Sequence, residues 1–156
     1  MSSYLSHRRK GFQGGVTAFD GFGNRSRSFN GVDDYVEIPD NADIPTGAHT
    51  CSCWLKIGRL TANAAGQGPI TKWGGSGRSF ALLIVNTPIA TPYIYISGNG
   101  TDAVNVSSNQ GLSIDEWYHI AWTYTTSTSL KVYINGVLKN TLTNGIPHAI
   151  YDSQTK

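Results

Sequence analysis

The acidic residues are the side chains through which this chain could hydrolyse a glycan. Glycosidases place two carboxylates about 5–9 Å apart, which on a single strand requires acids at alternate positions. None of the ten acids has that spacing: Asp33 and Asp34 are adjacent, so their side chains diverge, and Glu116 precedes Trp117 at the entrance of an expected strand. Motifs for a serine nucleophile, a zinc peptidase or a phosphate-binding loop are also absent from the sequence. We therefore expect no enzymatic activity and rank glycoside hydrolysis as the least favoured function.

The histidines and cysteines give little support to a metal site. The histidines have no ligand spacing among themselves or with the cysteines; they are His7, His49, His119 and His148. His119 lies between aromatic residues of an expected strand, which favours a hydrogen-bonded structural imidazole. Cys51 and Cys53 are two residues apart in one strand, so both point to the same face and are poorly placed for an intrachain disulfide. We expect two reduced, buried thiols.

Aromatic residues next to polar loops are the third source of chemistry. Sugar-binding sites combine an aromatic platform with Asn, Asp or backbone partners. Trp73 precedes the glycine-rich run 74–77, and Tyr93 and Tyr95 share one face of a strand that leads to Asn99. The sequence therefore indicates a glycan site formed by Trp73, Tyr93, Tyr95 and Asn99. Burial of the three aromatic side chains in the core is the open alternative.

These candidate residues lie on short runs that have the periodicity of strands. Only 14% of the residues are charged, and Gly, Thr, Ser and aromatic residues are abundant, which favours strands and turns over helical bundles. Asn135-Gly136, between two apolar runs, is typical of a β-hairpin, because a type I′ turn needs positive φ at both central residues. The pattern predicts an antiparallel sandwich of eight or nine strands, at 35–38, 49–57, 70–73, 80–85, 93–97, 103–107, 117–124, 130–134 and 137–142.

Two of these runs alternate clearly between two faces. Along 49–57, Trp54 shares its face with Thr50, Ser52 and Lys56, which indicates that this face is partly exposed to water. Along 117–124, one face carries Tyr118, Ile120, Trp122 and Tyr124, and the other carries Trp117, His119, Ala121 and Thr123.

Four motifs, in order along the chain, resemble laminin G-like, concanavalin A-like jelly-roll domains. They are SFNGVDDYVEI at 28–38, the run 50–56 centred on Trp54, WYHIAWTY at 117–124, and VYING at 132–136. The resemblance covers about residues 28–142 and implies an all-β, antiparallel two-sheet jelly-roll sandwich. It also implies that Trp54, Trp117 and Trp122 are aromatic side chains packed inside the sandwich. Because this fold carries many activities, the resemblance indicates the fold and not the function.

The resemblance also bears on calcium and on the C-terminus. Related domains often bind calcium at the rim of the sandwich, and Asp40, Asp43 and Asp102 stand in loops that offer suitable oxygens. The same residues are typical of turns, which is the favoured interpretation. No other cofactor is expected. After the hairpin, family members usually continue for longer than this chain, in which only 14 residues follow Leu142. We therefore expect the last one or two strands to be missing. Residues 16–20, a neighbouring subunit or a longer gene product would then cover the open edge.

We expect residues 1–27 to form a basic, glycine-rich and flexible N-terminal arm ahead of a domain at 28–156. The arm has a net charge of +4, and the rest of the chain has −2. Tyr4 and Phe12 flank the basic run Arg8, Arg9 and Lys10, and such apolar anchors around charges suit docking to a protein partner. A solvated tail is the alternative. The domain lacks the basic stripe of nucleic-acid binders, so we expect an assembly partner, with oligomerisation left open, and no nucleic acid.

The sequence indicates an attachment module that does not span a membrane. No apolar run reaches about 18 residues, and no apolar segment follows the basic cluster, so we expect neither a membrane span nor a signal peptide. The protein would be made in the cytoplasm and act on the surface of a particle or cell. These observations favour a non-catalytic attachment or decoration module on a larger assembly, such as a virus particle or a cell surface, that binds a glycan or a protein. A soluble carbohydrate-binding lectin is the alternative.

Overall fold

The computed structural model describes residues 26–31, 33–40, 43–60, 66–74, 77–86 and 89–153. The chain divides into two compact units, Met1–Pro39 and Asp40–Lys156. The predicted arm lies almost entirely outside the described residues. The same holds for its candidate docking residues, Tyr4, Arg8, Arg9, Lys10 and Phe12, and for the predicted replacement strand at 16–20.

In the first unit, the described residues form a turn around Asn30. The Asn30 Oδ1 accepts hydrogen bonds from the backbone N–H groups of Asp33 (3.1 Å) and Asp34 (3.3 Å). The predicted strand at 35–38 was wrong: this run has no regular secondary structure apart from a single bridge residue, Glu37. Pro39, which cannot donate a ladder hydrogen bond, follows a run of only four residues, and Tyr35 and Ile38 are exposed.

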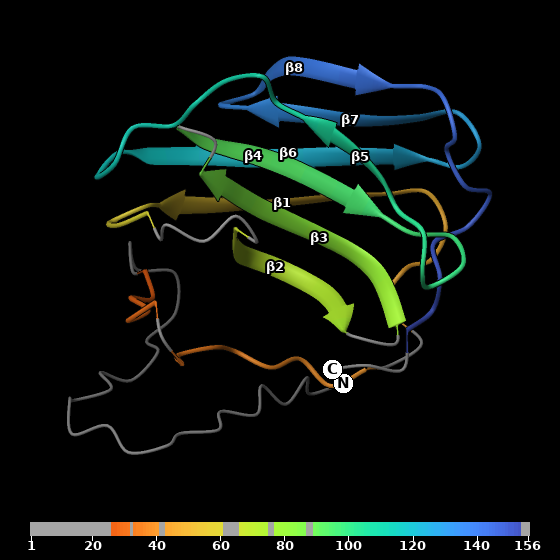
Figure 1. Ribbon diagram of the computed structural model, residues 1–156, viewed down its shortest axis with the longest axis horizontal. Helices are drawn as coiled ribbons and strands as arrows, with labels where there is room; N and C mark the ends of the chain where they lie inside the picture. Colours follow the sequence, from red (N-terminus) through yellow and green to blue (C-terminus); the bar gives the residue numbers. More distant parts are fainter. Residues whose placement is uncertain are drawn as a thin grey trace. The chain divides into compact units, whose positions relative to one another are not determined.

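The second unit contains eight strands in two four-stranded antiparallel sheets (Figure 1). One sheet has the order β1-β6-β7-β8, and the other has the order β2-β3-β4-β5. The strands are β1 (His49–Lys56), β2 (Gln67–Gly74), β3 (Gly77–Asn86), β4 (Ala90–Ile96), β5 (Val104–Ser107), β6 (Trp117–Thr125), β7 (Ser129–Ile134) and β8 (Val137–Leu142). The predicted all-β two-sheet sandwich is therefore confirmed. No helix of the described chain is long and apolar enough to cross a membrane.

The core lies between the two sheets. Alternation along β6 turns Tyr118, Ile120, Trp122 and Tyr124 inward, and they pack with side chains from β3 and β4 such as Leu82, Ile84 and Ile94. Trp122 is fully buried, and its indole N–H has no hydrogen-bond partner in the described structure. Apolar packing therefore holds this side chain. β3 is buried along most of its length, in agreement with its nearly continuous apolar sequence.

The β7–β8 hairpin has the predicted turn. Ile134 pairs with Val137, and between them Asn135 has a φ of 51° and Gly136 a φ of 78°. Both values lie in the left-handed region, where Asn and Gly are the favoured residues. The turn places Asn135 next to β6, because Ile120 pairs with Ile134.

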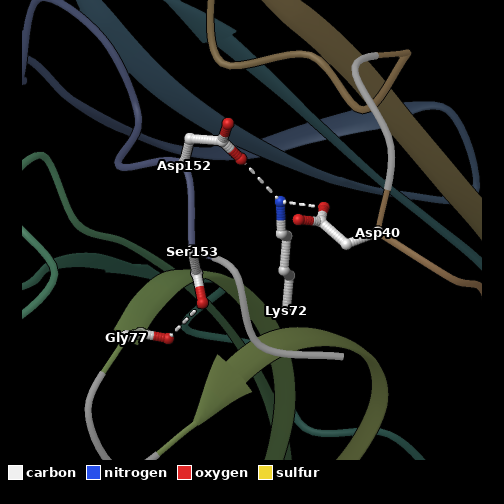
Figure 2. Close-up of polar contacts among 5 residues, drawn as sticks. All are labelled: Asp40, Lys72, Gly77, Asp152 and Ser153. Atoms are coloured by element: carbon white, nitrogen blue, oxygen red, sulfur yellow. Dashed lines mark hydrogen bonds and ion pairs between the residues drawn. The ribbon is translucent and has the colours of Figure 1, made fainter.

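The segment after β8 closes one end of the sandwich without forming a strand. Pro147 O accepts a hydrogen bond from Tyr124 of β6 (2.7 Å), and the Tyr151 N–H donates to Ser97 O beyond β4 (2.8 Å). At Ser153, which is fully buried, the hydroxyl donates to Gly77 O at 2.9 Å (Figure 2). These contacts tie the end of the described chain to both sheets.

An ion-paired lysine fixes the same segment to β2. The Lys72 Nζ lies 2.7 Å from Asp40 Oδ1 and 2.9 Å from Asp152 Oδ1, between the two carboxylates (Figure 2). Burial lowers the pKa of Lys72, but the hydrogen bonds and negative charges of Asp40 and Asp152 outweigh it and raise that pKa above its ordinary value. Residues before β1 and after β8 are thereby joined through one side chain.

Candidate functional site

The outer face of the β1-β6-β7-β8 sheet carries exposed aromatic side chains. Trp54 on β1 pairs directly with His119 on β6, and their ring centroids are 5.3 Å apart with the planes tilted by 51°. Trp117, two residues before His119, points to the same face because side chains of a strand alternate. Trp54 is 66% exposed and Trp117 is 48% exposed. Two large aromatic side chains exposed side by side are typical of a binding site.

These side chains line an open groove with a polar end. The groove has a volume of about 390 Å³ and is lined by Trp54, Trp117, His119 and Asn135; we call it the Trp54 groove. Asn135 is held in place by two hydrogen bonds to His119: its Oδ1 accepts from His119 N–H (2.9 Å), and its own N–H donates to His119 O (2.8 Å). Its side-chain NH₂ group is left to donate to a ligand.

The strands around the groove contribute lysines and no acids to the outer face. Lys56 pairs with Trp117 across the β1–β6 ladder, and Lys131 of β7 lies opposite Thr123 farther along the sheet. All eight described strands lack Asp and Glu. Next to Trp54 and His119, the small residues Ser52 and Ala121 face each other. The groove therefore combines aromatic surface, an amide donor and an imidazole, and Lys56 lies beside it as the cross-strand partner of Trp117.

The prediction that Trp54 and Trp117 pack inside the sandwich was wrong, whereas the one for Trp122 is confirmed. The cause is strand alternation: Trp122 shares the inner face of β6, while Trp117 is an odd number of residues away and must point outward. Trp54 likewise alternates with the inward-facing Cys53 and Leu55. The polar residues that share the face of Trp54 in the sequence were the signal that placed it outside.

His119 also differs from expectation. A hydrogen-bonded structural imidazole was predicted, but the ring is half-buried against Trp54, and within the described ranges neither ring nitrogen makes a hydrogen bond. The residues that fix it are its strand neighbours and the backbone contacts of Asn135. The imidazole is thus available to a molecule in the groove.

Three of the four predicted glycan residues come together on the outer face of the other sheet. Trp73 and Tyr95 have ring centroids 5.9 Å apart in an edge-on arrangement, and Tyr95 stacks on Tyr93 at 6.1 Å. All three are half-buried, and the Arg78 guanidinium lies over the Trp73 ring at 5.7 Å. Burial raises the pKa of Tyr95, and the neighbouring Tyr93 adds to this. Much of this aromatic surface is already in contact with protein.

Asn99, the fourth predicted residue, organises its own loop. Its Oδ1 accepts hydrogen bonds from the backbone N–H groups of Thr101 (3.0 Å) and Asp102 (2.8 Å), and its Nδ2 donates to the Asp102 carboxylate (2.9 Å). An amide used in this way is the turn chemistry typical of Asn, and it has little capacity left for a ligand.

The three calcium candidates do not gather into one site. Asp40 is paired with Lys72, and Asp102 accepts the Asn99 amide. In the described part of the chain, no group of three or more His, Cys, Asp or Glu side chains is placed to hold a metal ion. At Asp40 and Asp102, the carboxylates therefore serve an ion pair and a turn.

Cys51 and Cys53 are free thiols on the inner side of β1, half-buried against the core. Burial raises the pKa of both thiols, and for Cys53 the neighbouring Cys51 adds to the effect, giving a pKa of about 11. A thiol with so high a pKa is a poor nucleophile near neutral pH. Neither side chain lines the Trp54 groove.

Two antiparallel four-stranded sheets packed face to face define the protein as an all-β sandwich. The chain belongs to the concanavalin A-like lectin/glucanases superfamily, whose family model matches residues 30–155. This confirms the resemblance seen in the sequence. No curated protein matches the chain.

Among solved structures, the chain is similar to domain 4 of AbnA, a GH43 extracellular arabinanase from Geobacillus stearothermophilus, in complex with arabinotriose. The match has a TM-score of 0.52 and 19% sequence identity, and it covers 78% of this chain and 57% of that chain. The chain thus spans little more than half the length of that relative, and the likeness concerns the fold.

Proposed function

We propose that this domain is a non-catalytic glycan-binding module and that the sugar lies in the Trp54 groove. The observation that carries the proposal is the pair of exposed indoles, Trp54 and Trp117, beside the polar groups of His119 and Asn135. Aromatic rings cover the apolar C–H face of a sugar, while a few fixed polar groups bind its hydroxyls.

The comparisons support this proposal at the level of the fold. Domain 4 of AbnA was solved in complex with arabinotriose, so one domain of similar fold accommodates a short sugar chain. The Trp54 groove is favoured over the Trp73–Tyr95–Tyr93 cluster because its indoles are more exposed, whereas Arg78 already covers the Trp73 ring. A ligand would gain more from burying a surface that is still in water.

The absence of acids from the strands supports the non-catalytic part of the proposal. Glycosidases need two carboxylates about 5–9 Å apart beside the sugar. In the described chain the acids nearest to the groove in sequence are Asp115 and Glu116, and the Glu116 Oε2 accepts a hydrogen bond from Tyr118 OH (2.7 Å), whose side chain belongs to the inner face. The wider attachment role, with residues 1–27 as a tether, stays a prediction because the arm lies outside the described residues.

A binding titration with single variants tests the proposal. Wild-type protein is screened on a glycan array, and the best neutral or charged trisaccharide is then titrated by calorimetry. Trp54→Ala and Trp117→Ala should each weaken binding about tenfold or more, as expected for a central aromatic contact. Trp73→Phe, in the other sheet, is the control and should bind as the wild type does. Binding lost in the Trp73 variant and kept in the Trp54 variant would move the site to the Trp73 cluster, and no glycan bound at all would contradict the function.

A further inference from the structure

We infer that the glycan bound in the Trp54 groove carries negative charge, as a carboxylate or a sulfate on its sugar rings. This inference rests on the proposed function and adds to it the chemical class of the ligand. It comes from the charges around the groove and is independent of the aromatic residues that carry the glycan proposal.

Lys56 supplies the charge next to the aromatic surface. It is the direct cross-strand partner of Trp117, and its side chain is exposed. Residues paired across an antiparallel ladder have Cβ atoms about 4.5–5.5 Å apart, so the ammonium can reach over the Trp117 ring to a ligand lying on it. Within the described residues, Lys56 forms no ion pair, so its charge is not already neutralised by a neighbour.

The charged side chains that the strands of this sheet turn to the outer face are lysines. On the outer face, β1 carries Lys56, β6 carries His119 and β7 carries Lys131, and the four strands of this sheet carry no Asp or Glu. His49, by contrast, faces the core, where its ring lies against Tyr124 and Phe80. A surface of one sign raises the local concentration of ligands of the opposite sign. A neutral sugar would gain nothing from this arrangement, whereas an anionic sugar gains attraction in addition to its contacts with the indoles.

Two acids, Asp115 and Glu116, directly precede Trp117 and oppose this attraction. The Glu116 carboxylate accepts a hydrogen bond from Tyr118 OH, a neutral donor that does not cancel the charge of a carboxylate. Asp115, in the turn before β6, is joined to the end of β1 through its backbone N–H, which donates to Ile57 O at 2.8 Å. Its exposed carboxylate repels an anionic ligand near Lys56, so Asp115→Asn should strengthen the binding of such a ligand and leave a neutral ligand unaffected.

Matched trisaccharides test the inference. The probes are trigalacturonate, its fully methyl-esterified form, neutral galactotriose and sulfated galactotriose, each titrated into the full chain. Trigalacturonate should bind about three- to fivefold more tightly than its methyl ester, which has the same sugar rings but carries uncharged methyl esters in place of the carboxylates. The difference should disappear when NaCl is raised from about 0.05 M to about 0.5 M, because salt screens exposed charges. The sulfated probe shows whether sulfate replaces carboxylate.

Two lysine variants separate a local contact from net charge. Lys56→Met should remove the preference for trigalacturonate and keep the affinity for the methyl ester. Lys131→Met makes the same change of charge but lies opposite Thr123, six residues or about 20 Å along β6 from Trp117, and should keep the preference. Equal affinity of the wild type for all four probes would overturn the charge inference and leave the glycan site standing. Binding to none of them and to no array glycan would overturn both.

Discussion

Trp54 and His119 lie directly opposite each other on β1 and β6, with their ring centroids 5.3 Å apart. Cross-strand pairs of this kind restrict both side chains without burying them. Because Asn135 also fixes the backbone of His119 through two hydrogen bonds, the polar and aromatic sides of the groove are positioned by one segment of β6. A preformed arrangement lowers the entropic cost of binding a ligand.

The tryptophans on the two faces of the first sheet should differ sharply in their contribution to stability. Trp122 is fully buried in the core, so Trp122→Ala should lower the free energy of unfolding by about 3–5 kcal/mol. Trp54 is 66% exposed, and Trp54→Ala should change the free energy of unfolding by no more than about 0.5 kcal/mol. Urea unfolding followed by circular dichroism measures both. A large loss in the Trp54 variant would show that this side chain is structural.

The ion pairs of Lys72 should stabilise the fold in a pH-dependent way. The pKa of Lys72 is raised above its ordinary value of 10.5, so the stabilisation is complete below that pH and is lost as the pH rises through the folded-state pKa. Lys72→Met should cost about 1–3 kcal/mol at pH 7, less than a fully buried pair because Asp152 is half-exposed.

Urea unfolding of the wild type and the Lys72→Met variant between pH 7 and pH 11 measures this difference. The gap between the two free energies should stay constant up to about pH 10 and shrink above it. A gap that instead grows at alkaline pH would contradict the assigned ion pairs.

The thiols of β1 should react slowly in the folded protein. The pKa of Cys53 is about 11, and that of Cys51 is also raised, so very little thiolate is present at pH 8. Alkylation by iodoacetamide, followed by mass spectrometry, should be slow in native protein and fast in urea. Rapid labelling of the native protein would mean that β1 is more exposed than its position against the core indicates.

The hairpin turn should depend on glycine for backbone reasons alone. Gly136 has a φ of 78°, and a Cβ atom at this position would meet no atom within 4 Å. Gly136→Ala should therefore cost about 1–2 kcal/mol through the left-handed backbone conformation and not through a clash. Thermal unfolding measures the loss, and Gly136→Asn, a residue that tolerates this region, should recover most of it.

Much of the fold was predictable because short-range patterns determine it. Alternation along 117–124 gave the inner face of β6, and Asn135-Gly136 gave the hairpin, since few residue pairs adopt that turn. The family resemblance was specific for the sandwich. The run 35–38 was wrongly predicted to be a strand, because a pattern of four residues does not show whether a neighbouring strand pairs with it.

The site was predictable only in part. Strand alternation predicted that Tyr93 and Tyr95 share a face, whereas the contact of Trp73 with Tyr95 and with Arg78 depends on strand register and was not predicted. The Trp54 groove was missed because the family resemblance assigned Trp54 and Trp117 to the core, against the polar residues on their own face. The pairing of Trp54 with His119 depends on strand register between residues far apart in sequence, and a single sequence does not contain that information.

The most direct test of the glycan site is a titration followed by the indole N–H signals in a two-dimensional ¹⁵N NMR spectrum. The chain has four tryptophans, so four signals report on the groove, the Trp73 cluster and the core at once, and each is assigned by a Trp→Phe variant. On addition of trigalacturonate or arabinotriose, the signals of Trp54 and Trp117 should shift, while those of Trp73 and Trp122 stay in place. Shifts confined to Trp73, or no shift with any bound glycan, would contradict the account.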